Sequence, residues 1–227
     1  MRITPTRERE KEFLAELSAH YGPGTLLGGV DEVGRGSLAG PVSVGIAVID
    51  AGTSDIFPAR MRDSKQLSPA TRERIVEECA AWPRMVAIGH AGADVVDTDG
   101  IIGALRAAAA HAMQQLAACG LTPHGILLDG SHDWWSHETL WGETVLPALP
   151  VRTVVKGDAS CAVIAAASVV AKVERDRLMV EYARQYEGYD WEHNKGYSSA
   201  THTAGLAALG PSPLHRTSWR LPGVSGS

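Results

Sequence analysis

The chain is poor in cysteine and has no long apolar run. Its three cysteines, Cys79, Cys119 and Cys161, are scattered among 227 residues without a CxxC pair. This argues against a disulfide framework or a zinc cluster and favours a reducing compartment. The longest stretch of low polarity, Cys161–Ala171, falls well short of the roughly 20 residues that a membrane span requires. Met1–Lys11 is charged and lacks the apolar segment of a secretory signal, so we expect a cytoplasmic protein with no membrane partner.

Acidic residues are absent from the C-terminal stretch. None follows Glu192, whereas Lys195, Arg216 and Arg220 do. The formal net charge of −5 by itself argues mildly against nucleic acid as a partner. The locally basic stretch is compatible both with a phosphate-facing surface and with a polar tail, and charge alone leaves the two open.

The chain length suits one large domain, or one domain with a small appendage. Apolar runs predict strands at Leu26–Glu32, Val42–Ile49, Arg84–His90, Gly125–Asp129 and Val151–Val155. Helical patterns cover Thr6–His20, Pro69–Ala81 with Ser68 as N-cap, Asp99–Cys119, Ser160–Tyr186 and Ser199–Leu209. Because strands and helices interleave after an initial strand pair, we expect an α/β fold in which helices cover a mixed sheet.

The segment with the clearest chemical signal is an acidic pair in a glycine-rich turn. Asp31 and Glu32 follow an apolar run and precede Gly34, Arg35 and Gly36. Two adjacent carboxylates repel each other and resist burial, so they call for a cation. The glycines let the backbone approach a ligand closely, and exposed backbone N–H groups suit a sugar or a phosphate. The hexapeptide alone is also compatible with a solvated strand end before a tight turn.

Three acidic positions share one context, in which an apolar strand gives way to glycine. Asp31 lies before Gly34, Asp129 before Gly130, and Asp158 directly after Gly157. Strand ends of an α/β sheet meet at one edge of the fold, so these carboxylates can converge. Converging carboxylates favour Mg²⁺ or Mn²⁺ over zinc. Two such ions are the usual apparatus for phosphodiester hydrolysis.

The side chains of Asp31 and Glu32 cannot both point inward from a regular strand, because neighbouring strand residues face opposite sides. We therefore expect Asp31 to be the central ligand, and Glu32 to contribute differently, through a distorted backbone or its main-chain carbonyl. Asp176 is a rival for the fourth carboxylate. Flanked by Arg175 and Arg177, it is expected on a solvated charged face, so Asp158 is preferred.

An ordered set of motifs carries a resemblance to a known family. The motifs are Asp31–Gly36 with Leu38–Pro41, Asp63–Leu67, Leu128–Gly130, Lys156–Asp158, Ala165–Asp176, and Asn194–Tyr197 with His202 and His215-Arg216. Together, over roughly residues 28 to 220, they resemble bacterial ribonuclease HII, of the type 2 ribonuclease H family.

The resemblance implies a ribonuclease H-like mixed sheet with a small C-terminal helical segment. It divides the chain into an N-terminal helical extension (1–25), a catalytic domain (26–190), a C-terminal helical segment completing the substrate groove (191–220) and a flexible tail (221–227). It also implies a metal-dependent endoribonuclease that cleaves the RNA strand of RNA–DNA hybrids. Single ribonucleotides embedded in duplex DNA would be cut on their 5′ side, in support of ribonucleotide removal. Two divalent ions, Mn²⁺ or Mg²⁺, would serve the reaction.

The motifs also imply roles for individual residues. The metal-binding and catalytic carboxylates would be Asp31, Glu32, Asp129 and Asp158. The substrate-binding residues implied by the motifs would be the 2′-hydroxyl sensors Gly34, Arg35 and Gly36 and the deoxyribose partner Tyr197. Lys65, Lys156 and Lys195 are compatible both with substrate-binding contacts to phosphates and with idle surface lysines. The 2′-hydroxyl distinguishes RNA from DNA, and a glycine-rich backbone can donate to it and accept from it.

The segment Ser131–Ser136 diverges from the family pattern, and for Trp134 and Trp135 we expect a hydrophobic flap over the sheet. Two alternatives to the endoribonuclease stay open: another nuclease or strand-transfer enzyme on the same fold, such as a resolvase, and a catalytically inactive nucleic-acid-binding module. Since no apolar surface strip is evident, we expect a monomer. Whether a DNA sliding clamp binds the tail is open.

Overall fold

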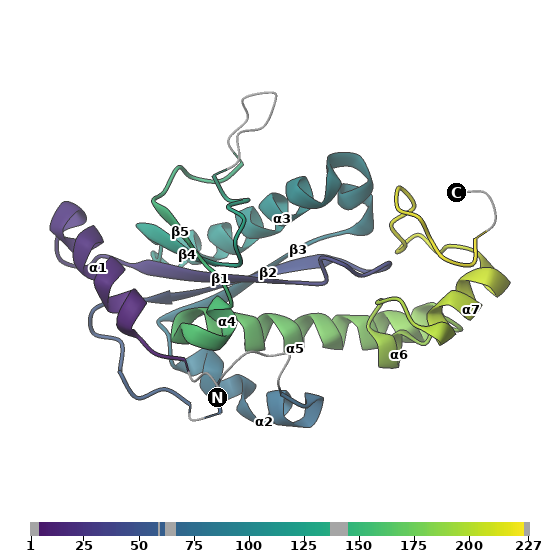
Figure 1. The fold of residues 1–227 in the computed structure, drawn as a ribbon, viewed down its shortest axis with the longest axis horizontal. Coiled ribbons are helices and arrows are strands. Elements are labelled where there is room, and N and C mark those ends of the chain that lie inside the picture. Colours follow the sequence, from purple (N-terminus) through teal and green to yellow (C-terminus); the bar gives the residue numbers. More distant parts are fainter. Residues whose placement is uncertain (1–4, 59, 62–66, 137–144, 225–227) are drawn as a thin grey trace.

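The structure is a computed structural model that describes residues 5–58, 60–61, 67–136 and 145–224. A five-stranded sheet in the order β3-β2-β1-β4-β5 forms its centre (Figure 1). The central strand β1 (Leu27–Val33) pairs antiparallel with β2 (Val42–Ile49) and parallel with β4 (Gly125–Asp129). The edge strands are β3 (Met85–Ala91), antiparallel to β2, and β5 (Val151–Val154), parallel to β4. The expected mixed sheet is therefore confirmed.

Helices cover both faces of this sheet. They are α1 (Glu8–Tyr21), α2 (Pro69–Ala81), α3 (Ala93–Ala118), α4 (Gly157–Ser160), α5 (Ala162–Gln185), α6 (Trp191–Asn194) and α7 (Ala200–Leu209). In Figure 1, α3 lies on one side of the sheet, and α5 with α2 lies on the other. α1 packs at one end of the molecule, whereas α6 and α7 gather at the far end of α5 (Figure 1).

Two apolar clusters fix these layers. On one face, Val44 and Ile46 of β2 pack with Leu105 of α3 in a buried cluster. On the other face, Leu27 of β1 packs with the apolar first half of α5 and with α1 and α2. Alternation along the strands sends successive side chains to opposite faces, and because both faces are covered, every residue of β2 is buried.

A local signal explains the start of α2, whereas α3 and α5 depart from the predicted helix boundaries. Ser68 caps α2 by accepting a hydrogen bond from the backbone of Thr71, with Pro69 at the first helical position, as predicted. The predicted helix from Asp99 begins earlier, at Ala93, and a non-helical residue, Gly100 with φ +70°, interrupts it. The helix predicted over 160–186 forms as α5 and begins at Ala162, because Cys161 is extended and separates it from the short α4.

Within the described residues, no helix combines the length and the apolar character needed to cross a membrane.

Candidate active site

Three aspartates from three different elements converge at the carboxyl ends of β1 and β4. Asp31 of β1, Asp129 of β4 and Asp158 of α4 each offer an oxygen, and these atoms all lie within 4.8 Å of one another. Asp31 and Asp158 are buried, at 5% and 4% exposure. Parallel pairing of β1 with β4 brings the strand ends together, and α4 follows directly on β5. Three of the four predicted carboxylates thus meet, although they are far apart in sequence.

The backbone of α4 orients Asp129. Its Oδ1 accepts hydrogen bonds from the N–H groups of Gly157, at 2.7 Å, and Asp158, at 3.3 Å. These N–H groups belong to the first turn of α4, where helical donors have no partner within the helix. One carboxylate of the cluster is therefore held by the element that carries another.

Glu32 lies on the other face of β1. Gly29 lies two residues before Asp31. A Cβ added at Gly29 would point toward α5 and lie 2.5 Å from Val163 Cγ1. Asp31 shares that face because strand side chains repeat every two residues. Among the described residues, Glu32 is not part of the aspartate group; its carboxylate pairs with Arg35 at 3.0 Å. The expected difference between the two acids is thus visible in the strand geometry.

The two tryptophans after Asp129 are core residues. Trp134 and Trp135 are 1% and 2% exposed, and both belong to the apolar cluster on the α3 side of the sheet. The carbonyl oxygens of both accept hydrogen bonds from Arg106 of α3. Trp134 Nε1 also lies 3.4 Å from Glu32 Oε2. The predicted flap is confirmed, and it reaches the second acid of the pair.

The turn Gly34–Gly36 needs glycine at its first position. Gly34 has φ +81°, and an added Cβ would lie 2.1 Å from Nε of Arg175. Positive φ and close packing both exclude larger residues there. Gly36, by contrast, is exposed and has open space around it. Arg35 projects outward, and its side chain is 44% exposed.

Two buried arginines hold the inner side of this turn. Arg216 donates to the carbonyl oxygens of Gly34, at 2.7 Å, and Arg35, at 2.8 Å. Arg175 donates to Pro41 O and to Ser37 Oγ, each at 2.8 Å. Both side chains are fully buried. Burial, and then repulsion from Arg175, lowers the pKa of Arg216 to about 10. With the carbonyls of Gly34 and Arg35 bound from the buried side, the turn is held in one orientation next to two buried cationic side chains.

Asp176 lies in a different environment from the one predicted for it. Asp176 was expected on a solvated charged face between two arginines. Instead, its side chain is 16% exposed and forms ion pairs with Arg72, at 3.6 Å, and with Lys172. The reason is helical phase: Arg175 continues the buried side of α5, which also carries Ala171 and Met179. Residues spaced by four lie on one face of a helix.

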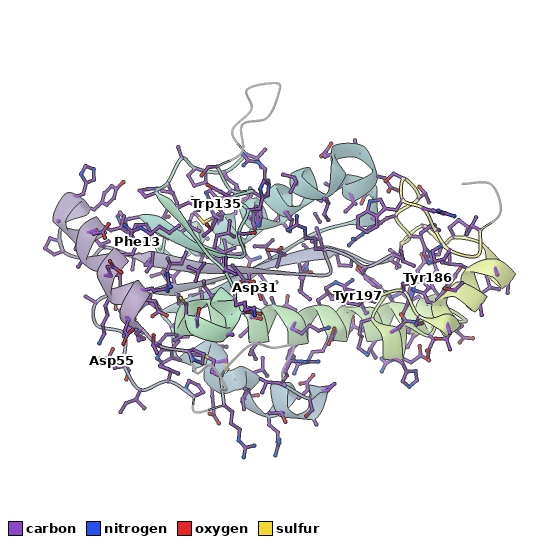
Figure 2. The ribbon with its side chains drawn as sticks, viewed as in Figure 1. Phe13, Asp31, Asp55, Trp135, Tyr186 and Tyr197 are labelled. Atoms are coloured by element: carbon purple, nitrogen blue, oxygen red, sulfur yellow. The ribbon has the colours of Figure 1, made fainter. Side chains whose placement is uncertain are left out.

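Tyr197 contacts the glycine turn directly. Its hydroxyl oxygen accepts a hydrogen bond from Gly34 N–H at 3.1 Å. In Figure 2, Asp31 lies near the beginning of α5, and Tyr197 lies farther along this helix, toward α6. The Tyr197 ring lies 5.7 Å from the Lys172 ammonium and 5.5 Å from the Arg175 guanidinium, which are cation–π distances. The predicted substrate tyrosine and the predicted sensor turn therefore form one surface.

A buried histidine pair supports the backbone of Tyr197. His202 Nδ1 donates to Tyr197 O at 3.0 Å, and its Nε2 lies 3.0 Å from Nε2 of His215. Trp191 Nε1 donates to the same His202 nitrogen, and His215 Nδ1 accepts from Ser212 N–H. This pattern assigns both imidazoles as neutral. Burial, and then His202, lowers the pKa of His215 to about 4.

Two of the three predicted phosphate-binding lysines, Lys156 and Lys195, belong to the described residues. Lys156 is exposed, with φ 56°, between β5 and α4. Lys195 ends α6 with φ 53°, and its ammonium donates to the carbonyl of Glu192. Lys65 lies outside the described residues. Lys195 and Tyr197 also line a groove of about 650 Å³ between α2, α5 and α6.

The aspartate cluster fits a divalent metal ion. Carboxylate oxygens are the hard ligands that Mg²⁺ and Mn²⁺ prefer, and the cluster contributes neither thiol nor imidazole. Carboxylates this close repel one another unless protons or cations intervene. The residues present therefore suit a hard divalent cation.

Comparisons with known proteins agree with this geometry. A family model described as Ribonuclease HII matches residues 28–221. Ribonuclease HII of Streptomyces avermitilis is 39% identical over 215 residues, which cover 95% of this chain and 83% of that protein.

Two solved structures share the fold. The ribonuclease HII of Archaeoglobus fulgidus, solved in complex with PCNA, has a TM-score of 0.64 at 22% identity, covering 88% of this chain and 98% of that chain. Bst-RNase HIII, solved in complex with Mn²⁺, has a TM-score of 0.61 at 19% identity, covering 89% of this chain and 70% of that chain. On the strength of the family model and the sequence relatives, the chain belongs to the ribonuclease HII family and is a ribonuclease H-type enzyme.

Proposed function

We propose that this protein hydrolyses the RNA strand of RNA–DNA hybrids and cuts on the 5′ side of single ribonucleotides embedded in duplex DNA. The observation that carries the proposal is the convergence of Asp31, Asp129 and Asp158 within 4.8 Å, beside a glycine turn that contacts Tyr197. The first feature suits phosphodiester hydrolysis. The second suits recognition of a sugar that has a hydroxyl group next to one that lacks it.

The three aspartates would hold the metal, and Glu32 would join them through its side chain or its main-chain carbonyl. Two divalent ions, when bound, would stabilise charge at the phosphodiester and activate the attacking water. The hydrogen bonds from Gly157 and Asp158 orient the Asp129 carboxylate before any ion arrives. Metal-binding side chains that are already oriented lose less entropy when they bind the ion, and they bind it with a defined geometry.

Substrate selection would lie with the turn and the tyrosine. The buried Arg216 occupies the carbonyl groups of Gly34 and Arg35, which leaves the outer face of the turn for the ribose 2′-hydroxyl. The flat ring of Tyr197 would pack on the adjoining deoxyribose. Lys156 and Lys195, together with Lys65, would contact phosphates and position the duplex without reading its sequence.

In this proposal, the segment 191–220 completes the groove that binds the nucleic-acid substrate. It contributes Tyr197 and Arg216, and Asp97 of α3 anchors its end by accepting hydrogen bonds from Thr217 and Ser218. The scissile bond would be the one between phosphorus and the 3′ oxygen of the nucleotide before the ribonucleotide. Its hydrolysis leaves a 3′-hydroxyl and a 5′-phosphate.

The test uses a labelled DNA duplex that contains one ribonucleotide. Incubation with Mg²⁺ or Mn²⁺ should give a single cut on the 5′ side of the ribonucleotide, and EDTA should abolish it. An all-DNA duplex of the same sequence and a branched DNA are the controls. Cleavage of either DNA control, with the ribonucleotide ignored, would favour the resolvase-type alternative. No cleavage of any substrate would favour an inactive binding module.

A further inference from the structure

The backbone between Asp158 and α5 is held by a residue from the beginning of the chain. Thr6 N–H donates to Ser160 O at 2.9 Å, and Ala162 N–H donates to Thr6 O at 3.1 Å. Thr6 and Cys161 thereby form an isolated parallel bridge. The extended link between α4 and α5 thus pairs with a segment that lies outside the matched family region, residues 28–221.

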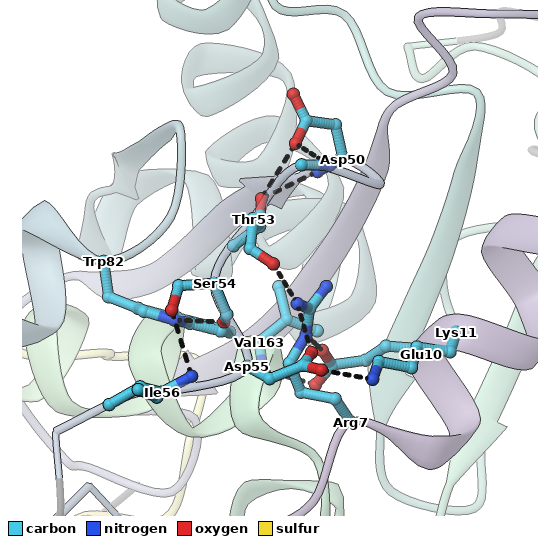
Figure 3. A network of polar contacts seen from close by, with 11 residues as sticks. Arg7, Glu10, Lys11, Asp50, Thr53, Ser54, Asp55, Ile56, Trp82 and Val163 are labelled. Carbon is cyan, nitrogen blue, oxygen red and sulfur yellow. Dashed lines mark hydrogen bonds and ion pairs between the residues drawn. The ribbon is translucent and has the colours of Figure 1, made fainter.

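Glu10 of α1 caps the helix that begins at this link. The N-cap residue of α5, Cys161, supplies no side-chain hydrogen bond. Glu10 Oε1 accepts one from Val163 N–H at 2.7 Å, and Glu10 Oε2 accepts one from Arg7 Nε at 3.0 Å (Figure 3). A carboxylate at a helix N-terminus satisfies an orphan donor and interacts favourably with the helix dipole. Here a distant helix provides the cap.

Stability alone does not account for this carboxylate. Glu10 is fully buried, at 0% exposure. Burial raises its pKa, against the hydrogen bonds from Val163 and Arg7, which favour the charged form. A buried ion pair gives little net stability compared with apolar residues of the same volume. What it does supply is one defined position for the backbone that it binds.

That backbone is connected to the aspartate cluster through α4, which spans only Gly157–Ser160. At its first turn, Gly157 N–H and Asp158 N–H donate to Asp129. At its last residue, Ser160 O accepts from Thr6. A four-residue helix has little freedom between two such attachments, so a shift at the α5 end displaces Asp158 relative to Asp129.

We propose that Glu10 is a positioning residue for the metal site: its hydrogen bond to Val163 N–H holds the α4–α5 link in register, and thereby sets Asp158 against Asp129. The inference rests on the function proposed above, in which these aspartates bind divalent cations.

The experiment measures Mn²⁺ binding to the full chain by isothermal titration calorimetry, without substrate, alongside thermal unfolding. Glu10→Asp keeps the charge but is one methylene too short to reach Val163. Glu10→Gln loses the charge but keeps an oxygen acceptor of the same reach. We expect Glu10→Asp and Glu10→Ala to weaken Mn²⁺ binding by about 10-fold, the lower end of effects seen for residues that orient metal ligands. Glu10→Gln should keep the wild-type affinity.

Asp55→Asn is the matched control. Asp55 pairs with Arg7 at 3.0 Å and with Lys11 at 2.5 Å on the same network (Figure 3), but its side chain is 61% exposed and does not reach α5. We expect its Mn²⁺ affinity to equal that of the wild type.

A purely structural role for Glu10 would lower the melting temperature and leave the Mn²⁺ affinity of folded Glu10→Asp unchanged; that result overturns the inference. An equal loss of affinity in Glu10→Gln and Glu10→Asp overturns it too, because the acceptor would then be irrelevant. By contrast, if the Asp31→Asn variant bound Mn²⁺ with the affinity of the wild type, the proposed function itself would be overturned.

Discussion

The hydroxyl of Tyr197 accepts a hydrogen bond from the backbone N–H of Gly34 at 3.1 Å. The two residues are 163 positions apart in the chain. The contact joins the C-terminal segment to the glycine turn that follows the first two acids, so the metal-binding and sugar-recognising parts of the proposed site share one framework.

Replacing Tyr197 should therefore impair recognition of the ribonucleotide. Tyr197→Phe removes a hydrogen bond of about 1 kcal/mol, and we expect a roughly fivefold slower cut at a single embedded ribonucleotide. Tyr197→Ala also removes the ring and should lose more, without unfolding the protein. Tyr189→Phe is the control, because its hydroxyl donates to Gly210 O, away from the turn. Wild-type rates in Tyr197→Ala would contradict the role of this residue.

The aspartate cluster gives the strongest expected loss. Asp31→Asn or Asp129→Asn removes a negative ligand, so cleavage with Mg²⁺ should fall below detection, while circular dichroism and hybrid binding stay near the wild type. Asp133→Asn is the matched control, because Asp133 follows Asp129 closely in the chain but is not part of the aspartate cluster. Its carboxylate accepts a hydrogen bond from Ser136 N–H instead. Retained cleavage in either cluster variant would refute the assignment of that residue as a ligand.

The glycine turn offers a test by stability. At Gly34, φ is +81° and a Cβ would lie 2.1 Å from Arg175 Nε. Gly34→Ala should therefore lower the free energy of unfolding by more than 1 kcal/mol, the scale of backbone strain alone. Gly36→Ala should be nearly neutral, because no atom of the described residues lies within 4 Å of the added Cβ. Urea denaturation of both variants measures the difference, and equal costs would show that the turn is not held as described.

The buried histidine pair predicts a pH dependence of stability. The pKa of His215 is lowered to about 4 from 6.5, so between these values the unfolded chain binds a proton that the folded chain does not. The free energy of unfolding should therefore fall, as the pH drops through this window, by up to about 1.4 kcal/mol per pH unit from this group. Denaturation from pH 7 to pH 4 should show a shallower slope in His215→Gln. An identical slope would mean that His215 is protonated in the folded protein.

Much of the site was predictable from local sequence, for a physical reason. Apolar runs that end in glycine mark strand ends, and parallel strands bring their carboxyl ends together, so Asp31, Asp129 and Asp158 could be placed at one edge without coordinates. The pleat likewise separated Asp31 from Glu32. Helix periodicity could also have placed Arg175 on the buried side of α5 with Ala171 and Met179, but its charge suggested exposure.

By itself, the sequence determined the α/β fold and the identity of the acids, because strand alternation, helix caps and glycine turns are local properties of the chain. Only the tertiary structure decided which partners those residues meet. The burial of Arg216 against the Gly34 carbonyl, the burial of Arg175 against the Pro41 carbonyl and the capping of α5 by Glu10 depend on contacts between distant segments. Such contacts leave no periodic signal, since a buried charge is stable only where the complete fold brings hydrogen-bonding partners to it.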